Sequence, residues 1–216
     1  MFRSLMIAGA LALGPMAAGC STANYAIQER FGIEKRDILV SRVEAVATEQ
    51  ADAQAEFADA LDAFRAVVAV DGGELERVYD DLSAAFDDAE GQANAVRDRV
   101  ASVKQVSNDL FREWEGELSE YSDAGLQRSS ERQLRTTRAR SAELERAMDA
   151  ATRSMDPVLA VFGDRVLFLK HNLNARAIAS LDAETAELEG DVARLIAEME
   201  RSIAAADAFI AEMGAG

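Results

Sequence analysis

Hydrophobic residues recur at alternating intervals of four and three along residues 75–121, for almost seven heptads. The inward positions are Leu75, Leu82, Ala89, Val96, Val103 and Leu110, and, offset by four, Tyr79, Phe86, Ala93, Val100, Ser107, Trp114 and Tyr121. These intervals place both sets on one stripe of an α-helix, with charged residues around the rest. Such a helix would be roughly 70 Å long. Its stripe must be buried against other helices.

Two further stretches carry matching stripes. A first helix is predicted from about Tyr25 or Phe31 to Val70, and a third from about residues 127–130 onwards. The first has inward positions at Leu39, Val43, Val46, Gln50, Ala53, Phe57, Ala60, Phe64 and Val67. The third has them at Leu134, Thr137, Ser141, Leu144, Met148, Ala151, Met155, Val158, Phe162 and Leu169. Pro157 falls inside the third helix, and the unbroken phase favours a kink there over a restart.

Turn residues separate these helices. Asp71, Gly72 and Gly73 predict a tight reversal, because glycine adopts positive φ without strain, and residues 122–125 predict the next turn. The phase fails between His171 and Asn174, where Asn172 tolerates left-handed geometry and Asn174 can cap a new helix. The fourth helix would bury Ile178, Leu181, Leu188, Val192, Leu195, Met199, Ile203, Ala206 and Ile210.

The predicted fold is all-α: an elongated antiparallel bundle or coiled coil of four long helices, each of about 40 to 48 residues, joined by short turns. The alternative is a three-helix coiled coil whose third helix runs on, kinked, past the others. Composition agrees with helices, since 49% of the residues are hydrophobic but only 6% are aromatic. No segment carries the pattern of a β-strand.

The first 19 residues read as a secretory signal, with Arg3 followed by an apolar run that is too short to span a bilayer. The block from Ala17 to Cys20 resembles the lipobox of bacterial lipoproteins, with Ala17 in place of the usual leucine. This resemblance implies acylation at Cys20, and Ser21 after it implies the outer membrane. The expected organisation is a signal peptide over residues 1–19, a lipidated tether over 20–30 and a helical domain over 31–213. The alternative is an ordinary cleaved signal and a soluble periplasmic protein.

Charge excludes one class of partner. The 23 basic and 39 acidic residues give a net charge of −16, whereas a nucleic-acid binder needs the opposite sign. An acidic run ends the second helix: Asp109, Glu113, Glu115, Glu117, Glu120 and Asp123. A basic run opens the third: Arg128, Arg132, Arg135, Arg138, Arg140 and Arg146. The simplest expectation is an ion-pair network across the turn; the alternative is contact with lipid head groups or another anionic polymer.

The densest polar group surrounds the one histidine, beside the predicted turn at Asp71. A single histidine and a single cysteine give a poor metal site, and Asp164 could orient His171 but no nucleophile accompanies the pair. We therefore expect no metal, no cofactor and no enzymatic activity. Capping of a tight turn is the simplest interpretation, and a partner-binding tip is the functional one. Its residues would be Asp71, Lys170, His171, Asn172, Asn174 and Arg176.

Four blocks of the chain resemble a known family. They are residues 31–40, 71–73, 110–115 and 169–178, which begin with Phe31, Asp71, Leu110 and Leu169. They are similar to an uncharacterised family of Gram-negative lipoproteins, domain-of-unknown-function family twenty-nine fifty-nine. The resemblance implies an envelope protein and brings no activity, cofactor or catalytic residue.

The expected function is that of a non-enzymatic scaffold or adaptor. It would be anchored in the membrane through Cys20 and bind an unknown envelope protein at the periplasmic face of the outer membrane. A periplasmic holdase or carrier of apolar cargo is the alternative, because Met148, Met155 and Met199 put flexible side chains on the core stripes. The oligomeric state stays open.

Overall fold

The structure is a computed structural model that describes residues 35–70, 74–182 and 184–214. These residues form helices with no β-strand among them. In chain order the elements are α2 (Lys35–Val68), α3 (Leu75–Glu117), the 3₁₀ turn η1 (Leu118–Glu120), α4 (Ala124–His171), α5 (Ala175–Asp182) and α6 (Thr185–Gly214). The all-α prediction is confirmed.

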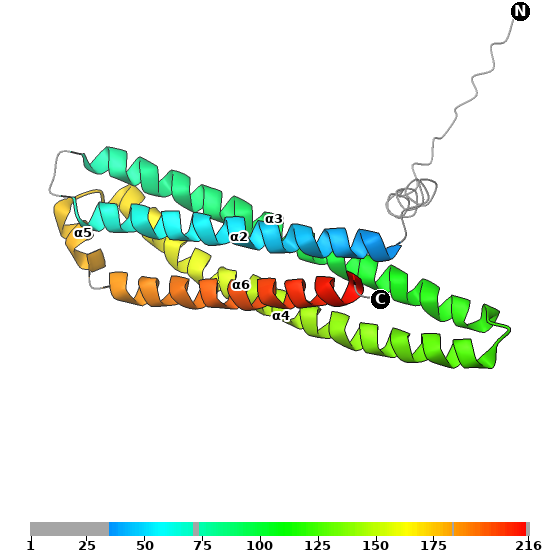
Figure 1. Cartoon of the computed structure of the whole chain (residues 1–216). Coiled ribbons are helices and arrows are strands. Elements are labelled where there is room, and N and C mark those ends of the chain that lie inside the picture. The colour runs from blue at the N-terminus through cyan, green and yellow to red at the C-terminus, as the bar shows by residue number, and fades with distance from the viewer. Residues whose placement is uncertain (1–34, 71–73, 183, 215–216) are drawn as a thin grey trace, which may run out of the picture. The chain divides into compact units, whose positions relative to one another are not determined.

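The four long helices form an antiparallel bundle. Helix α2 packs on α3 and α6, and α4 packs on the same two helices from the other side (Figure 1). This arrangement confirms the four-helix prediction over the three-helix alternative. The C-terminal part of α3 and the N-terminal part of α4 run past the first residue of α2 and the last residues of α6 (Figure 1). We call residues 112–133 the hairpin, and none of them is buried.

Hydrophobic periodicity predicted the core of α2 and α4 almost completely. All nine inward positions proposed for α2 are buried, including Phe57 and Phe64. In α4 all proposed positions are buried except Thr137, which is half-buried. The rings of Phe64 and Phe162 meet edge to face with centroids 6.5 Å apart, which ties α2 to α4 across the core.

Helix boundaries differ from the prediction at the hairpin turn. Helix α3 ends at Glu117 and continues as η1, so Tyr121 lies outside the helix. Helix α4 begins at Ala124 because the Asp123 carboxylate accepts hydrogen bonds from the backbone N–H groups of Gly125, at 2.6 Å, and Leu126, at 2.9 Å. The predicted start three or more residues later was therefore wrong. Helix α4 is continuous through Pro157, without a restart there.

The predicted break after α4 is confirmed. Helix α4 ends at His171, and the side chain of Asn174 accepts hydrogen bonds at 3.2 Å from the backbone N–H groups of Arg176 and Ala177. Asn174 thus caps α5, as a helix N-cap residue does.

The prediction of a single fourth helix was wrong, because this segment is divided into α5 and α6. Helix α5 buries Ile178 and Leu181 and contacts both α2 and α4, so it must turn before α6 can pack along the bundle. Within α6 the stripe passes through Ser202 and Phe209, which are buried, instead of Ile203 and Ile210, which are half-buried. The prediction followed hydropathy and chose Ile203, whereas strict heptad spacing from Leu195 points to Ser202.

Several predicted features lie outside the described residues. These are the signal segment, Cys20 and its tether, and the Asp71-Gly72-Gly73 turn. Within 35–214 and its gaps, no described helix is both long enough and apolar enough to cross a membrane.

Candidate functional site

The polar residues of the predicted tip lie where α4 ends, at the opposite end of the bundle from the hairpin (Figure 1). Asn172 donates a hydrogen bond from Nδ2 to the carbonyl oxygen of Phe168 at 3.0 Å, and Asn174 caps α5. These two asparagines therefore serve the turn, as the capping interpretation predicted. Lys170, His171 and Arg176 are exposed, and within the described chain none of them forms a side-chain hydrogen bond or ion pair.

Two apolar side chains beside this turn were missed from the sequence. Leu167 is 57% exposed and Phe168 is 39% exposed, one turn before His171 on α4. The signal was present in the run Val166-Leu167-Phe168-Leu169, because a helix with one buried stripe cannot cover four consecutive apolar residues. We call Leu167, Phe168, Lys170 and His171 the distal tip.

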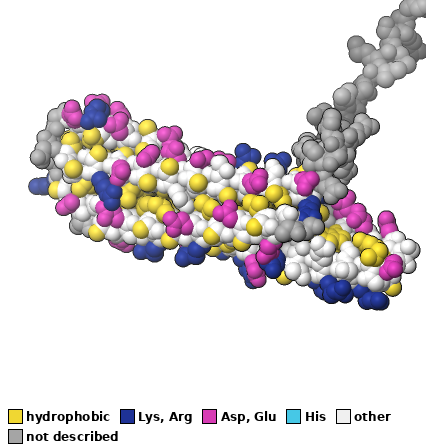
Figure 2. Space-filling model, viewed as in Figure 1, with side chains coloured by type: hydrophobic (Ala, Val, Ile, Leu, Met, Phe, Trp, Pro, Cys, Tyr) yellow, Lys and Arg dark blue, Asp and Glu magenta, His cyan; other side chains and the backbone are white. Residues whose placement is uncertain are grey.

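The exposed apolar residues lie at the ends of the bundle. The large hydrophobic side chains exposed in the described part of the chain are Leu167 and Phe168 at the distal tip, and Tyr121 (42%) and Leu126 (61%) at the hairpin turn. The other exposed positions of the described helices hold charged, polar or small residues, and Pro157. In Figure 2, acidic and basic side chains are interspersed with hydrophobic atoms, alanine included, along one face of the bundle. A contact driven by apolar burial is therefore expected at an end of the bundle.

The ion-pair network predicted across the hairpin is reduced to one link. Arg138 pairs with Glu115 at 2.5 Å and thereby joins the basic run to the acidic run. Arg135 pairs within α4, with Glu131, and Arg140 reaches Glu212 of α6. Among the described residues, no carboxylate lies within ion-pair distance of three arginines of the run, Arg128, Arg132 and Arg146.

Comparison with protein-family models shows the family of the chain. A family model described as "Protein of unknown function (DUF2959)" matches residues 24–213. The chain belongs to this family. The match spans all the described helices up to residue 213, so the bundle with its hairpin and distal tip is the DUF2959 domain. Searches of curated proteins and of solved structures found no match.

A groove on the DUF2959 domain separates α3 from α4 near the base of the hairpin. Beside it, two ion pairs join α3 to α4 one heptad apart, Arg97 with Asp156 and Lys104 with Asp149, both at 2.5 Å. At the next heptad stand Phe111 and Ala142, and a pocket of about 400 Å³ opens there. It is lined by Ser107, Asn108, Phe111, Arg112, Glu115, Arg138, Ser141, Ala142 and Glu145.

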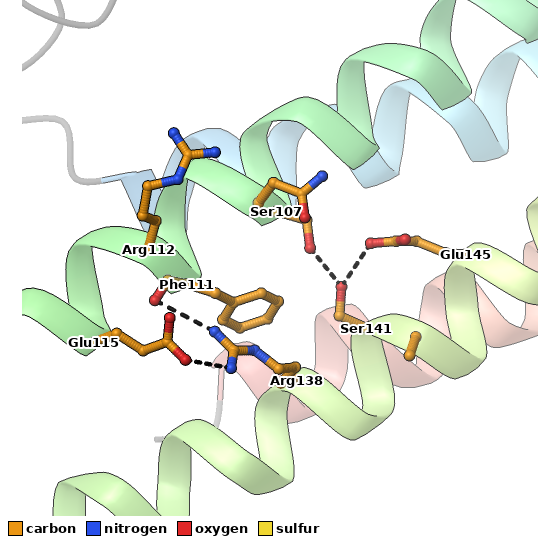
Figure 3. A pocket seen from close by; sticks show the side chains of 9 residues that line it. Ser107, Phe111, Arg112, Glu115, Arg138, Ser141 and Glu145 are labelled. Carbon is orange, nitrogen blue, oxygen red and sulfur yellow. Dashed lines mark hydrogen bonds and ion pairs between the residues drawn. The ribbon is translucent and has the colours of Figure 1, made fainter.

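Two buried hydroxyls form the floor of this groove (Figure 3). The Oγ atoms of Ser107 and Ser141 lie 2.7 Å apart, and Ser141 donates to Glu145 at 3.2 Å, so the hydroxyl of Ser107 donates to Ser141. The guanidinium of Arg138 lies 5.2 Å from the centre of the Phe111 ring and bonds to Glu115. This hydrogen bond lowers the pKa of the Glu115 carboxyl below its ordinary value of 4.5.

The hydrogen bonds at this groove join α3 to α4 within an interface that is otherwise apolar. A serine at an inward position on each of two facing helices is the signal for it in the sequence, since hydroxyls buried at one level must pair. In the described part of the domain no three His, Cys, Asp or Glu side chains gather as a metal site would require. Asp164 and His171 share no hydrogen bond there.

Proposed function

We propose that the protein is a lipid-anchored envelope scaffold that binds a protein partner at the distal tip. The observation that carries the proposal is the placement of exposed apolar side chains at the ends of a long, charged bundle. A helix of the length of α4, with 48 residues, separates its two ends by roughly 70 Å. A rod with distinct ends is suited to hold a partner at a distance from a surface.

Attachment to the outer membrane is proposed from the N-terminal pattern. Cys20 follows an apolar signal and small residues, and two or three acyl chains anchor a protein stably without an apolar surface on the protein itself. Incorporation of labelled palmitate into the wild type, with a Cys20→Ala control and membrane fractionation, tests this step. Label in the Cys20→Ala protein, or wild-type protein in the soluble fraction, would refute it.

The chemistry of the distal tip restricts the partner. Leu167 and Phe168 offer apolar area, while Lys170 and His171 border it with groups that carry or can carry positive charge. Interfaces commonly place aromatic and aliphatic anchors in a recess and complementary charge around it. The partner surface would therefore be an apolar recess bordered by carboxylates.

A matched pair of variants tests the tip. Leu167→Ser with Phe168→Ser removes the apolar anchors of the tip, whereas Tyr121→Ser with Leu126→Ser removes the same kind of exposed side chain at the hairpin. After crosslinking in intact cells, the tip variant should lose a discrete crosslinked partner that the hairpin variant keeps. Loss from both variants, or from neither, would contradict binding at the tip.

A second candidate is a periplasmic holdase that opens its helices around apolar cargo. It is favoured by polar groups inside the core, because Gln50 and Ser202 are fully buried and form no hydrogen bond with any described residue. The Arg65–Glu189 ion pair sets the register of α2 against α6, which brings Gln50 and Ser202 within about one helical turn. If opening matters, Gln50→Met should stabilise the closed bundle and reduce suppression of aggregation of an unfolded substrate. Unchanged suppression would remove this candidate.

A further inference from the structure

We propose that one exposed face of α4 binds the anionic surface of a phospholipid bilayer. The face consists of Arg128, Arg132, Arg135, Arg146 and Arg153, and we call it the arginine face. The intervals from Arg128 are 4, 7, 18 and 25 residues, which at 3.6 residues per turn all return close to the same side of the helix. The line extends for roughly 38 Å at 1.5 Å per residue.

These arginines point away from the core and remain available. All five are exposed. Within the described residues, Arg135 pairs only with Glu131 of its own helix, at 2.8 Å, and the other four have no ion-pair partner. Figure 2 shows Lys and Arg side chains gathered along the lower edge of the hairpin, where α4 lies in Figure 1. Half of the basic run, namely Arg128, Arg132 and Arg146, is therefore left without an ion-pair partner among the described residues.

Acidic neighbours offset part of this charge. On α4, the carboxylates three or four residues from these arginines are those of Glu131, Glu143, Asp149 and Asp156. Asp149 and Asp156 are paired with Lys104 and Arg97 of α3, and Glu131 is paired with Arg135 of the face itself. Glu143 forms no ion pair among the described residues. At physiological ionic strength charges farther than about 8 Å are largely screened, so the net charge of −16 does not by itself prevent this face from contacting an anionic surface. The arginine face thus presents a local positive potential on an acidic protein.

The shape of the arginine face is better suited to binding a flat surface than to binding a protein groove or a helix. It is the convex outer side of one helix, and its hollow is a shallow depression lined by Arg135, Thr136, Ala139, Arg140 and Glu143. A specific protein partner requires complementary packing over a fully buried centre, whereas an anionic bilayer attracts exposed arginines without it.

The position of the arginine face along the bundle also supports binding to a bilayer. Three of the five arginines lie at or next to the hairpin, the end at which α2 begins with Lys35, whose Nζ lies 2.7 Å from Glu113 of α3. Only 14 residues lie between Cys20 and Lys35, so the two are at most about 54 Å apart when the chain is fully extended. In this respect the inference rests on the proposed lipid attachment. Basic residues close to a lipid anchor add electrostatic attraction to an anionic bilayer surface.

Vesicle binding by unlipidated protein tests the arginine face separately from the anchor. The probe is the full chain with Cys20→Ala, sedimented with vesicles of phosphatidylcholine containing about 30 mol% phosphatidylglycerol, or of phosphatidylcholine alone. We expect binding to the anionic vesicles only, weakened on raising salt from about 50 mM to about 300 mM. Equal binding to both vesicles, or binding to neither, would overturn the proposal, whatever the outcome of palmitate labelling.

Two variants locate the binding. Arg128→Gln, Arg132→Gln and Arg135→Gln together should weaken vesicle binding by about 100-fold, at about fivefold for each arginine near an anionic surface. Arg146→Gln with Arg153→Gln should weaken it by about 25-fold on the same basis. The matched control is Arg77→Gln, Arg194→Gln and Arg201→Gln, which removes three exposed arginines whose partners lie within about one turn of each.

The variants distinguish binding through the arginine face from a general effect of net charge. The control variant should bind like the parent, and all variants should keep the helical circular dichroism of the parent. Equal losses in the control and the first variant would show that net charge alone matters and would overturn the proposal. Inorganic phosphate that releases the protein, where chloride at equal ionic strength does not, would indicate a site for single anions and would overturn it as well.

Discussion

The buried amide of Gln50 gives a direct test of how the core is built. Gln50 lies on the inward stripe of α2 with 0% exposure, and neither its Nε2 nor its Oε1 has a hydrogen-bond partner among the described residues. Burying an amide without a partner costs about 1–3 kcal/mol in proteins. Gln50→Met keeps the length and flexibility of the side chain while removing the polar group. We expect the free energy of unfolding to rise by about 2 kcal/mol.

The measurement is urea and thermal unfolding followed by far-UV circular dichroism. For a helical domain of this size, about 2 kcal/mol corresponds to a rise in Tm of about 4–8 °C. Gln92→Met is the matched control, because the Gln92 amide donates to the Glu49 carboxylate at 3.0 Å. This control should lower the stability by about 1 kcal/mol. Destabilisation by Gln50→Met would instead show that the Gln50 amide has hydrogen-bond partners in solution.

Three further predictions concern the hairpin and the groove beside it. Asp123→Ala removes the side chain that caps α4 and should lower the unfolding free energy by about 1 kcal/mol in urea titration. Because Arg138 lowers the pKa of Glu115 in the folded state, that pair stabilises the fold above the ordinary value of 4.5 and loses its effect as the pH falls below it. The stability difference between wild type and Glu115→Gln, followed by unfolding from about pH 6 to about pH 3, should therefore shrink toward the acid end. Ser141→Ala should cost about 1 kcal/mol alone and less when Ser107→Ala is already present, which a double-mutant cycle measures; additive costs would contradict the Ser107–Ser141 hydrogen bond.

The core was predictable from periodicity in α2 and α4, but only in part in α3. Five inward positions predicted for α3 are half-buried, and three others are buried instead. The half-buried positions are Leu75, Tyr79, Phe86, Leu110 and Trp114, and the unpredicted buried ones are Val78, Val106 and Phe111. Helices α2 and α4 each keep an uninterrupted alternation of four and three, so burial follows from the residues alone. The break between α5 and α6 could not be seen in this way, since Leu181 and Leu188 are one heptad apart and both are buried. Packing of α5 against α2 and α4 decides where the chain turns. Hydrophobic periodicity does not reveal that contact.

The candidate surfaces were predictable only in part, because sequence shows charge and hydropathy but not partners. The polar turn and its cap at Asn174 were identified from residue types that prefer these positions. The arginines of the basic run looked like one side of an ion-pair network, yet of this run only Arg138 bridges to the acidic run. Spacing on α4 turns Arg128 and Arg132 outward, and this orientation matters more than their closeness to the acidic run in the chain.

Photocrosslinking within the cell shows whether a partner protein contacts the distal tip. A photoreactive amino acid would be placed at Phe168 and, in separate strains, at exposed flank positions Ala101 on α3 and Ala193 on α6. We expect one discrete crosslinked envelope protein from Phe168 and none from the flank positions. The same product from the flank positions, or no product from Phe168 while a flank position yields one, would contradict it.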